Sequence, residues 1–313
     1  MNYYRIRCKP RTVWLTPWQA DTLFGQMCWA VLHEEGEKGL TEFLEPFMAG
    51  RPPFVLSNGF PGDLLPRPML PPAPTQPRPK VEAVAAMTAA KKEKSARLVS
   101  PEDFHRIRKG ERPPVPDPAP DGFRAQVELK NQINRITGTT TPPEGEPTGN
   151  LFSRTHLALP KGVDEISIYV GAGSEEGANR ALALLRRVSE GGYGAKKSSG
   201  YGAFTVLDMQ PLPDWSAPLD GANGIVTLSN FVPAAGDPVN GTYDTLVKYG
   251  KLGEELATAG TPFKFPVLMV QAGGVFRDSN PRPFYGRMVN GVHPDSRIVQ
   301  YGYALALPLR LPN

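Results

Sequence analysis

The sequence has few cysteines and histidines and no long hydrophobic run. Its 313 residues include two cysteines, Cys8 and Cys28, and four histidines. Two cysteines cannot form a zinc site alone, and a reducing cytoplasm is the simple expectation for such a chain. The N-terminus MNYYRIRCKP has no apolar core of a signal peptide, and no run of 18 apolar residues predicts a transmembrane helix. We therefore expect a cytoplasmic protein without a membrane partner.

Motifs for metal or nucleotide chemistry are also missing. The sequence contains neither Asp-x-Asp nor His-x-x-x-His, and in its glycine-rich stretch neither Lys196 nor Lys197 follows a glycine as the lysine of a Walker A loop does. RNA cleavage by acid–base chemistry needs a group that exchanges protons near neutral pH. None of His33, His105, His156 and His293 is paired in the sequence with a second catalytic group, although His33 and His156 would be the first candidates. We predict no catalytic residue, no metal site and no cofactor.

One glycine-rich stretch has side chains that are suited to ligand binding. It is GGYGAKKSSGYGAF, residues 191–204. The preceding residues have helical spacing and the following ones alternate like a strand, so the order helix–loop–strand is the reverse of a P-loop. An ordinary turn is the plain alternative, because glycine adopts positive φ without strain. The backbone N–H groups, two lysines and two serines nevertheless suit a phosphodiester backbone, and Tyr193 and Tyr201 could stack on bases.

Proline and positive charge are concentrated in one region. Sixteen of the 35 prolines lie between Pro52 and Pro120, which predicts an extended segment. Residues 78–135 contain 13 Lys or Arg against 8 Asp or Glu, an excess larger than the net charge of +4 of the whole chain. Within this region the run AVAAMTAAKKEKSARLV predicts a helix. A basic segment of this kind permits nucleic-acid binding without requiring it.

The periodicity of the remaining segments predicts an α+β protein. A strand is expected at 2–9, a helix capped at Thr16 or starting at Asp21, a short helix at 40–50, a long hairpin, a strand at EISIYV, a helix at 175–190 and a strand at 201–209. This order, β-α-β-β-α-β, is that of a ferredoxin-like (RRM/RAMP) domain. Strands near 225–232, 266–272 and 298–307 and a possible helix at 243–249 predict a second, degenerate domain of the same kind.

The predicted layout therefore has two ferredoxin-like domains. The first spans residues 1–210 and contains a long Pro-rich basic insertion at about 51–122 and a thumb hairpin at about 125–160. The second spans residues 222–313. The stretch PLPDWSAPLDGANG, 211–224, is the expected joint.

Several segments occur in an order that is similar to a known family: ADTLFGQMCWAVLHEEG, FPGDLLPRPML, NQINRITGTT…GNLF, GGYGAKKSSGYGAF and QYGYALALPL. Along nearly its whole length the chain resembles the subunit-four family of the type III-A CRISPR (Csm) effector complex, RAMP proteins of the Cas5 group. The resemblance implies a non-catalytic, RNA-binding subunit of an antiviral ribonucleoprotein. Such subunits cap the repeat-derived 5′ handle of the CRISPR RNA, and they dock the large polymerase-like, cyclic-oligoadenylate-forming subunit and the first backbone RAMP subunit. Target RNA is then met only indirectly, by base pairing within the complex.

The resemblance also implies which residues contact the RNA. It assigns the handle's phosphates to the glycine-rich loop, the kink of the RNA to the thumb, and a further phosphate to the start of the first helix. The corresponding residues are Gly192, Gly194, Lys196, Lys197, Ser198, Ser199, Gly200 and Gly202 in the loop, Asn131, Asn134, Arg135 and Arg154 in the thumb, and Asp21 and Thr22 in the helix. The family often has a Lys-Arg pair where this chain has Lys196-Lys197, which keeps the charge but not the bidentate geometry.

Two other functions are also compatible with the sequence. One is a RAMP endoribonuclease that processes precursor CRISPR RNA, and the other is a scaffold that docks proteins through its Pro-rich region. The related type III-B (Cmr) subunit is a further alternative within the same family.

Overall fold

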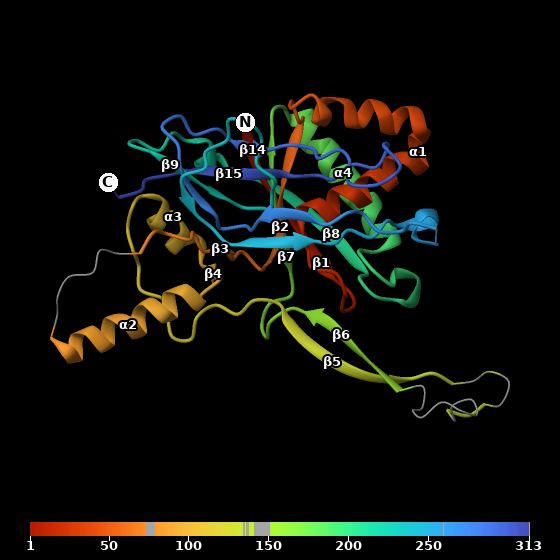
Figure 1. Ribbon diagram of the computed structural model, residues 1–313, viewed down its shortest axis with the longest axis horizontal. Coiled ribbons are helices and arrows are strands. Elements are labelled where there is room, and N and C mark those ends of the chain that lie inside the picture. The colour runs from red at the N-terminus through yellow and green to blue at the C-terminus, as the bar shows by residue number, and fades with distance from the viewer. Residues whose placement is uncertain (73–78, 134, 136–137, 141–150, 259, 313) are drawn as a thin grey trace.

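The computed structural model describes residues 1–72, 79–133, 135, 138–140, 151–258 and 260–312. Its first half is built on a four-stranded antiparallel sheet with the order β2-β7-β1-β8 (Figure 1). The strands are β1 (Asn2–Pro10), β2 (Phe54–Pro61), β7 (Ile166–Ala172) and β8 (Phe204–Pro211).

Two helices pack together on this sheet and complete the predicted order of elements. Helix α1 (Ala20–Met48) leads from β1 to β2, and α4 (Glu175–Gly191) leads from β7 to β8. The chain therefore runs β-α-β-β-α-β, with β7 and β1 as the central strands. The mixed α+β class expected from the sequence is confirmed.

The start and the interior of α1 differ from expectation. The helix begins at Ala20, and the preceding residue Gln19 has an extended backbone without a side-chain cap, so the capping box at Thr16 is wrong. The short helix expected at 40–50 is the second part of α1, which continues across a kink at Gly36 (φ +71°). Pro46 also lies inside this second part.

The predicted Pro-rich insertion is more ordered than its composition indicates. Residues 54–61 form β2, an edge strand of the first sheet, so an insertion starting at residue 51 is wrong. Its apolar run FVLSNGFP is almost wholly buried, and this burial outweighs the neighbouring prolines. The insertion also contains two short strands and two helices. These are β3 (Leu65–Pro66), α2 (Lys80–Ser95), β4 (Leu98–Val99) and α3 (Pro101–Arg108).

Helix α3 was not expected from the sequence, yet its local signals are clear. The hydroxyl of Ser100 accepts a hydrogen bond from the N–H of Asp103 (3.1 Å), and Pro101 occupies the first helical position. Phe104 and Ile107 are buried, so the helix packs its apolar side into the molecule.

The second half of the chain forms a five-stranded sheet with the order β10-β13-β9-β15-β14 and a two-stranded ribbon. The sheet strands are β10 (Gly241–Thr242), β13 (Val275–Arg277), β9 (Gly224–Thr227), β15 (Tyr303–Leu309) and β14 (Phe284–Gly286). The ribbon pairs β11 (Thr245–Lys248) with β12 (Val267–Val270). Strands near 225–232, 266–272 and 298–307 are confirmed.

The helix expected at 243–249 is wrong, because strand β11 occupies that segment. Thr245 and Val247 are exposed while Leu246 and Lys248 are partly covered, which is the alternation of a strand. Among the described residues from Gly224 onward the helical structure is η2, a 3-10 helix at Glu254–Thr258. The short helix α5 (Pro213–Ser216) lies in the predicted joint.

The two halves share one hydrophobic core. Ile6 and Ile168 of the first sheet belong to the same buried cluster as Leu305 of the second. The Tyr303 hydroxyl donates to the carbonyl of Phe47 (2.5 Å), which adds a polar link across the core. The halves are therefore packed as one body.

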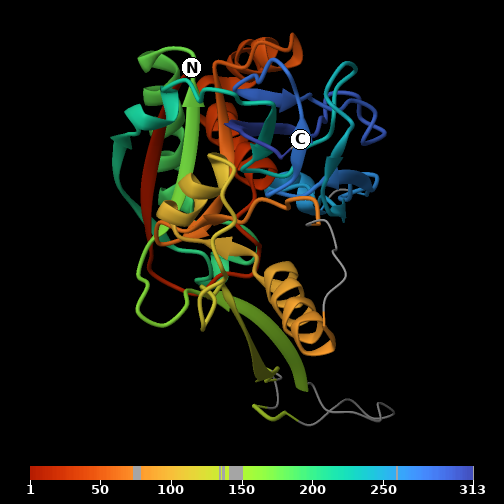
Figure 2. The ribbon, with the colours of Figure 1, turned by 90° about the vertical axis from the view of Figure 1, so that its left-hand side faces the viewer.

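A hairpin of β5 (Arg124–Asn131) and β6 (Leu151–Ala158) projects from this body, as the predicted thumb does. Figure 2 shows the hairpin and α2 extending from the same end of the molecule. At the base of the hairpin, the Trp14 and Leu157 backbones form an isolated bridge, and Phe123 packs edge-on against Trp14 (5.3 Å between ring centroids). No helix of the described residues is long and apolar enough to span a membrane.

Candidate RNA interface

The glycine-rich loop connects α4 to β8 and folds back on the segment before α1. It contains η1, a 3-10 turn at Lys197–Ser199. At Gly202 (φ +72°), a Cβ would lie 1.9 Å from the carbonyl oxygen of Tyr193. At Gly194 (φ +80°), a Cβ would lie 2.7 Å from the hydroxyl of Thr16, which accepts a hydrogen bond from the N–H of Ala195 (3.0 Å). These two glycines are required by close backbone approach within the protein itself.

Tyr193 is part of the core of this loop. It is fully buried and stacks on Trp18 with 4.2 Å between ring centroids. Its hydroxyl donates to the carbonyl of Pro17 (2.7 Å) and accepts from the N–H of Gln19 (3.2 Å). Burial raises the pKa of this hydroxyl. The expectation that Tyr193 stacks on bases is wrong, because its ring holds the loop against the chain before α1.

Tyr201 joins the loop to the thumb hairpin. The Lys130 ammonium lies 5.3 Å and the Arg154 guanidinium 5.4 Å from the centroid of its ring. Hydrogen bonds from Lys130 and then Arg154 lower the pKa of the Tyr201 hydroxyl. The ring is only 7% exposed, so it is not an open stacking platform for bases. The prediction for Tyr201 is therefore also wrong.

Arg154, predicted from the resemblance, is thus close to the loop, and Lys130 is a neighbour that sequence reasoning missed. Lys130 directly precedes Asn131 and faces Phe152 across the hairpin. Its position next to Asn131, a residue already predicted to contact RNA, could have indicated that Lys130 belongs to the same site. Lys130, which also pairs with Glu128 (3.2 Å), and Arg154 place two cations of the hairpin beside the glycine-rich loop.

The two loop lysines differ in their surroundings. Lys196 is exposed, adopts the left-handed conformation (φ +60°) and has no ion pair with a described residue. The Lys197 ammonium instead forms an ion pair with Glu254, just at the start of η2. Ser198 and Ser199 are exposed beside them. Lys196 is consequently the more available cation of the pair.

The start of α1 is occupied by contacts within the protein. The Asp21 carboxylate is buried, lies 2.9 Å from the Lys248 ammonium and accepts a hydrogen bond from the amide of Gln300 (2.9 Å). Lys248 also donates to the hydroxyl of Thr22 (3.0 Å). The N–H of Ala20 donates to Asn58 (3.0 Å). Asp21 and Thr22 therefore anchor β11 to α1, and the phosphate contact implied for this helix start stays a prediction.

The other thumb residues are distributed along the hairpin. Asn131 ends β5 opposite Leu151 and is exposed, and Arg135 is exposed beyond it. Asn134 lies outside the described residues. The structure therefore places Asn131 and Arg135 at the outer part of the hairpin and Arg154 near the glycine-rich loop.

The four histidines lie apart from one another. The Nε2 atom of His156 is 3.1 Å from the side-chain oxygen of Gln126 on the opposite strand. Both ring nitrogens of His293 are bonded, to the carbonyl of Thr261 (2.8 Å) and the N–H of Asp295 (3.0 Å). Burial lowers the pKa of His105, assisted by Lys109 and Arg108. Within the described part of the chain, no three His, Cys, Asp or Glu side chains form a metal-binding group.

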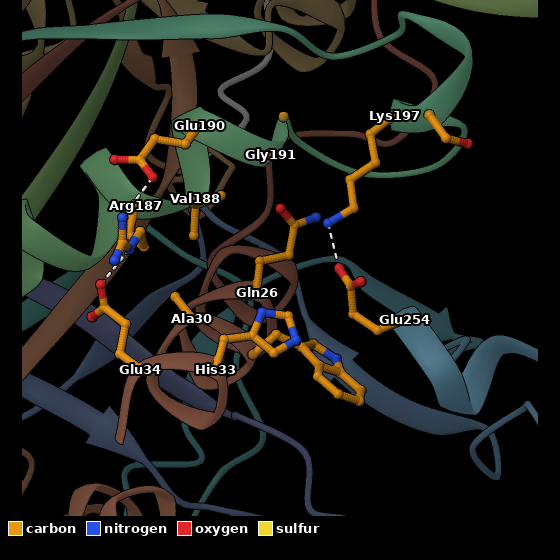
Figure 3. Close-up of a pocket in the computed structure, with 13 residues that line it drawn as sticks. Gln26, Ala30, His33, Glu34, Arg187, Val188, Glu190, Gly191, Lys197 and Glu254 are labelled. Carbon is orange, nitrogen blue, oxygen red and sulfur yellow. Dashed lines mark hydrogen bonds and ion pairs between the residues drawn. The ribbon is translucent and has the colours of Figure 1, made fainter. Parts of the chain in front are cut away.

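A cavity of about 630 Å³ lies between α1, the end of α4, the glycine-rich loop and η2 (Figure 3). Trp29 and His33 of α1 line it on one side, and Lys197 and Glu254 close another side with their ion pair. This cavity could not be predicted from the sequence, because its walls come from three distant segments.

Comparison with known proteins agrees with this architecture. Residues 19–205 match the model of the RAMP superfamily. No curated protein sequence matches the chain. A chain in the crystal structure of a Csm1–Csm4 cassette in complex with cA4 has 17% identity and a TM-score of 0.64, with 100% of both chains covered. A chain in the Csm3–Csm4 subcomplex of the type III-A CRISPR-Cas interference complex has 14% identity and a TM-score of 0.57, with 99% of each covered.

At these identities the two solved structures establish the fold that this chain shares with them. The family match covers α1, β2, the thumb hairpin, β7, α4 and the glycine-rich loop, and it ends as β8 begins. The chain belongs to the RAMP superfamily.

Proposed function

We propose that the protein is the non-catalytic subunit that caps the repeat-derived 5′ handle of CRISPR RNA in a type III-A interference complex. In this role it binds the handle with the glycine-rich loop and the thumb. It also anchors the large polymerase-like subunit and contacts the first backbone RAMP subunit. A cytoplasmic ribonucleoprotein is the setting that this role requires.

The observation that carries the proposal is the junction of the loop and the thumb. Lys196 is exposed and unpaired among the described residues, the exposed Ser198 and Ser199 follow it, and Lys130 and Arg154 lie on Tyr201 next to the loop. Cations, hydroxyls and a tight backbone turn are the groups that bind an RNA backbone irrespective of its sequence. The contact with Tyr201 fixes the thumb relative to the loop, so both elements can hold one bent RNA segment.

The proposal of these partners is supported by the similarity of fold along the whole chain. The two related structures are, by their descriptions, complexes of Csm4 with Csm1 and of Csm4 with Csm3. We extend both contacts to this chain, and we regard its second sheet as a degenerate ferredoxin-like domain covering roughly residues 222–313 after a first domain of 1–210.

RNA binding by the loop is tested with Lys196→Ala/Lys197→Ala. We expect weaker binding of every RNA sequence and a slope of log K against log salt that is reduced by roughly one to two charges. Since Lys197 is held by Glu254, most of the change should already occur in Lys196→Ala. Lys161→Ala, at an exposed position outside the loop, is the control. An unchanged slope in the double variant would exclude the phosphate role.

The capping role is tested by purifying the complex through this chain after co-expression with the other subunits and a CRISPR array. We expect bound RNAs that share one repeat-derived 5′ end, and crosslinks from that end near Lys196 or Arg135. The alternative, a RAMP endoribonuclease, predicts cleavage of precursor RNA by the isolated chain and its loss in His33→Ala or His156→Ala. Absence of CRISPR RNA from the purified complex would refute the capping role.

A further inference from the structure

We infer that the cavity beneath the glycine-rich loop binds one unpaired adenine base of the RNA whose backbone lies on that loop. This inference rests on the proposed function and adds a site of base recognition to it. The cavity volume of about 630 Å³ is in the range of pockets that hold a ligand of nucleoside size. Gly192, Lys197 and Ser198 of the glycine-rich loop line the cavity, so an RNA bound to the loop would pass beside it.

Gln26 supplies the polar recognition group. Figure 3 shows its side chain reaching from α1 toward Lys197 of η1 in the glycine-rich loop. Its side-chain oxygen is buried and accepts no hydrogen bond from the described residues. Buried acceptors in proteins are normally bonded, so a rotation of the Gln26 amide that turns this oxygen from its buried position into the cavity, toward a donor of the base, would satisfy it. A glutamine amide pairs with adenine through the exocyclic N6 donor and the N7 acceptor.

Aromatic side chains form a wall beside Gln26. The rings of Trp29 and His33 have centroids 5.9 Å apart and are inclined by 44°, and both line the cavity. Ala30 and Val188 add apolar surface. Unpaired bases bind proteins by stacking on such rings while their edges form hydrogen bonds, which is how single-stranded RNA is read.

The charges of the cavity favour an uncharged base over a phosphate group. Arg187 is paired with Glu34 and with Glu190 (2.7 Å), and Lys197 is paired with Glu254. Each cation of the lining is therefore already neutralised by a carboxylate. Lys197 belongs to the glycine-rich loop itself, so it can exchange Glu254 for a phosphate of the same nucleotide, with the base inside the cavity and the backbone on the loop.

The test compares octamers of adenylate and of uridylate bound to the full-length protein and to Gln26→Leu. We expect the wild type to prefer adenylate, and Gln26→Leu to reduce the ratio of the two affinities by roughly tenfold, as for loss of one bidentate base contact. Trp29→Ala should weaken binding of both RNAs through lost stacking. Gln210→Leu, a glutamine outside the cavity, should leave the ratio unchanged.

The outcomes separate this inference from the proposed function. If the wild type binds RNA but Gln26→Leu keeps the same ratio, or if adenylate is not preferred, base recognition by the cavity is refuted while the phosphate role stands. If the wild type binds neither RNA, the proposed function fails first. Melting temperatures of the variants check that each is folded.

Discussion

The close approach at Gly202 makes a sharp prediction about the stability of the glycine-rich loop. A Cβ added there would lie 1.9 Å from the Tyr193 carbonyl oxygen, at a backbone φ of +72°. Gly200 has a similar φ of +85°, but nothing lies within 4 Å of its virtual Cβ. An alanine at either position would therefore cause backbone strain, but only the alanine at position 202 would also overlap with neighbouring atoms.

The magnitudes follow from this difference. For Gly200→Ala we expect a loss of about 1–2 kcal/mol in the free energy of unfolding, the typical strain of a left-handed alanine. Gly202→Ala adds the displacement of backbone around Tyr193, which brings the loss to about 2–5 kcal/mol. The hydrogen bond from the N–H of Tyr193 to the carbonyl of Gly202 (2.8 Å) would be distorted by the same displacement.

The assay is equilibrium unfolding in urea followed by tryptophan fluorescence. Trp18 is a local reporter, because its ring stacks on Tyr193. Since both halves of the chain share one core, we expect a single transition for each protein. Equal losses in the two variants would refute the steric argument and would indicate that backbone strain alone explains the glycines.

Two further predictions concern stability. Tyr193→Phe leaves the N–H of Gln19 and the carbonyl of Pro17 without their bonds to the hydroxyl, so the free energy of unfolding should fall by about 1–3 kcal/mol, measured in urea, and an unchanged value would refute the role of this hydroxyl. The bonds from Arg7 to Glu165 lower the pKa of that carboxyl, so its contribution is present above the unfolded pKa near 4.5 and is lost as pH falls through the lower folded value. Glu165→Gln should therefore reduce the free energy of unfolding by about 1 kcal/mol at pH 7 and have little effect at a pH below the folded pKa of Glu165. An equal effect at both pH values would contradict the stabilising role of the Arg7–Glu165 pair.

Local patterns in the sequence predicted much of the first sheet and the position of the loop. The strands at β1 and β7, the amphipathic helix α4 and the hairpin β5–β6 all have periodic or turn signals within a single segment. Such signals depend on neighbouring residues alone, so they can be read without knowledge of the fold. The region at 51–61 misled the prediction, because its prolines mask a strand that is stabilised by burial against β7.

The bounds of the glycine-rich loop were predicted and its contacts were not, and its RNA-binding role stays a prediction. The residues of the loop are correctly placed together, but Tyr193 and Tyr201 face protein groups and not an open surface. Their partners, such as Pro17 and Lys130, lie far along the chain. No spacing rule relates such residues before the chain has folded.

Local patterns were therefore sufficient to predict the element order of the first sheet, the helix–loop–strand arrangement of the glycine-rich loop, and the basic character of residues 78–135. Three-dimensional contacts were needed to show that Lys197 is paired with Glu254, that Lys248 contacts Asp21 across 227 positions, and that Gln26 lines a cavity. Periodicity and turn propensity are local, whereas ion pairs, buried hydroxyls and cavities depend on which distant segments are brought into contact.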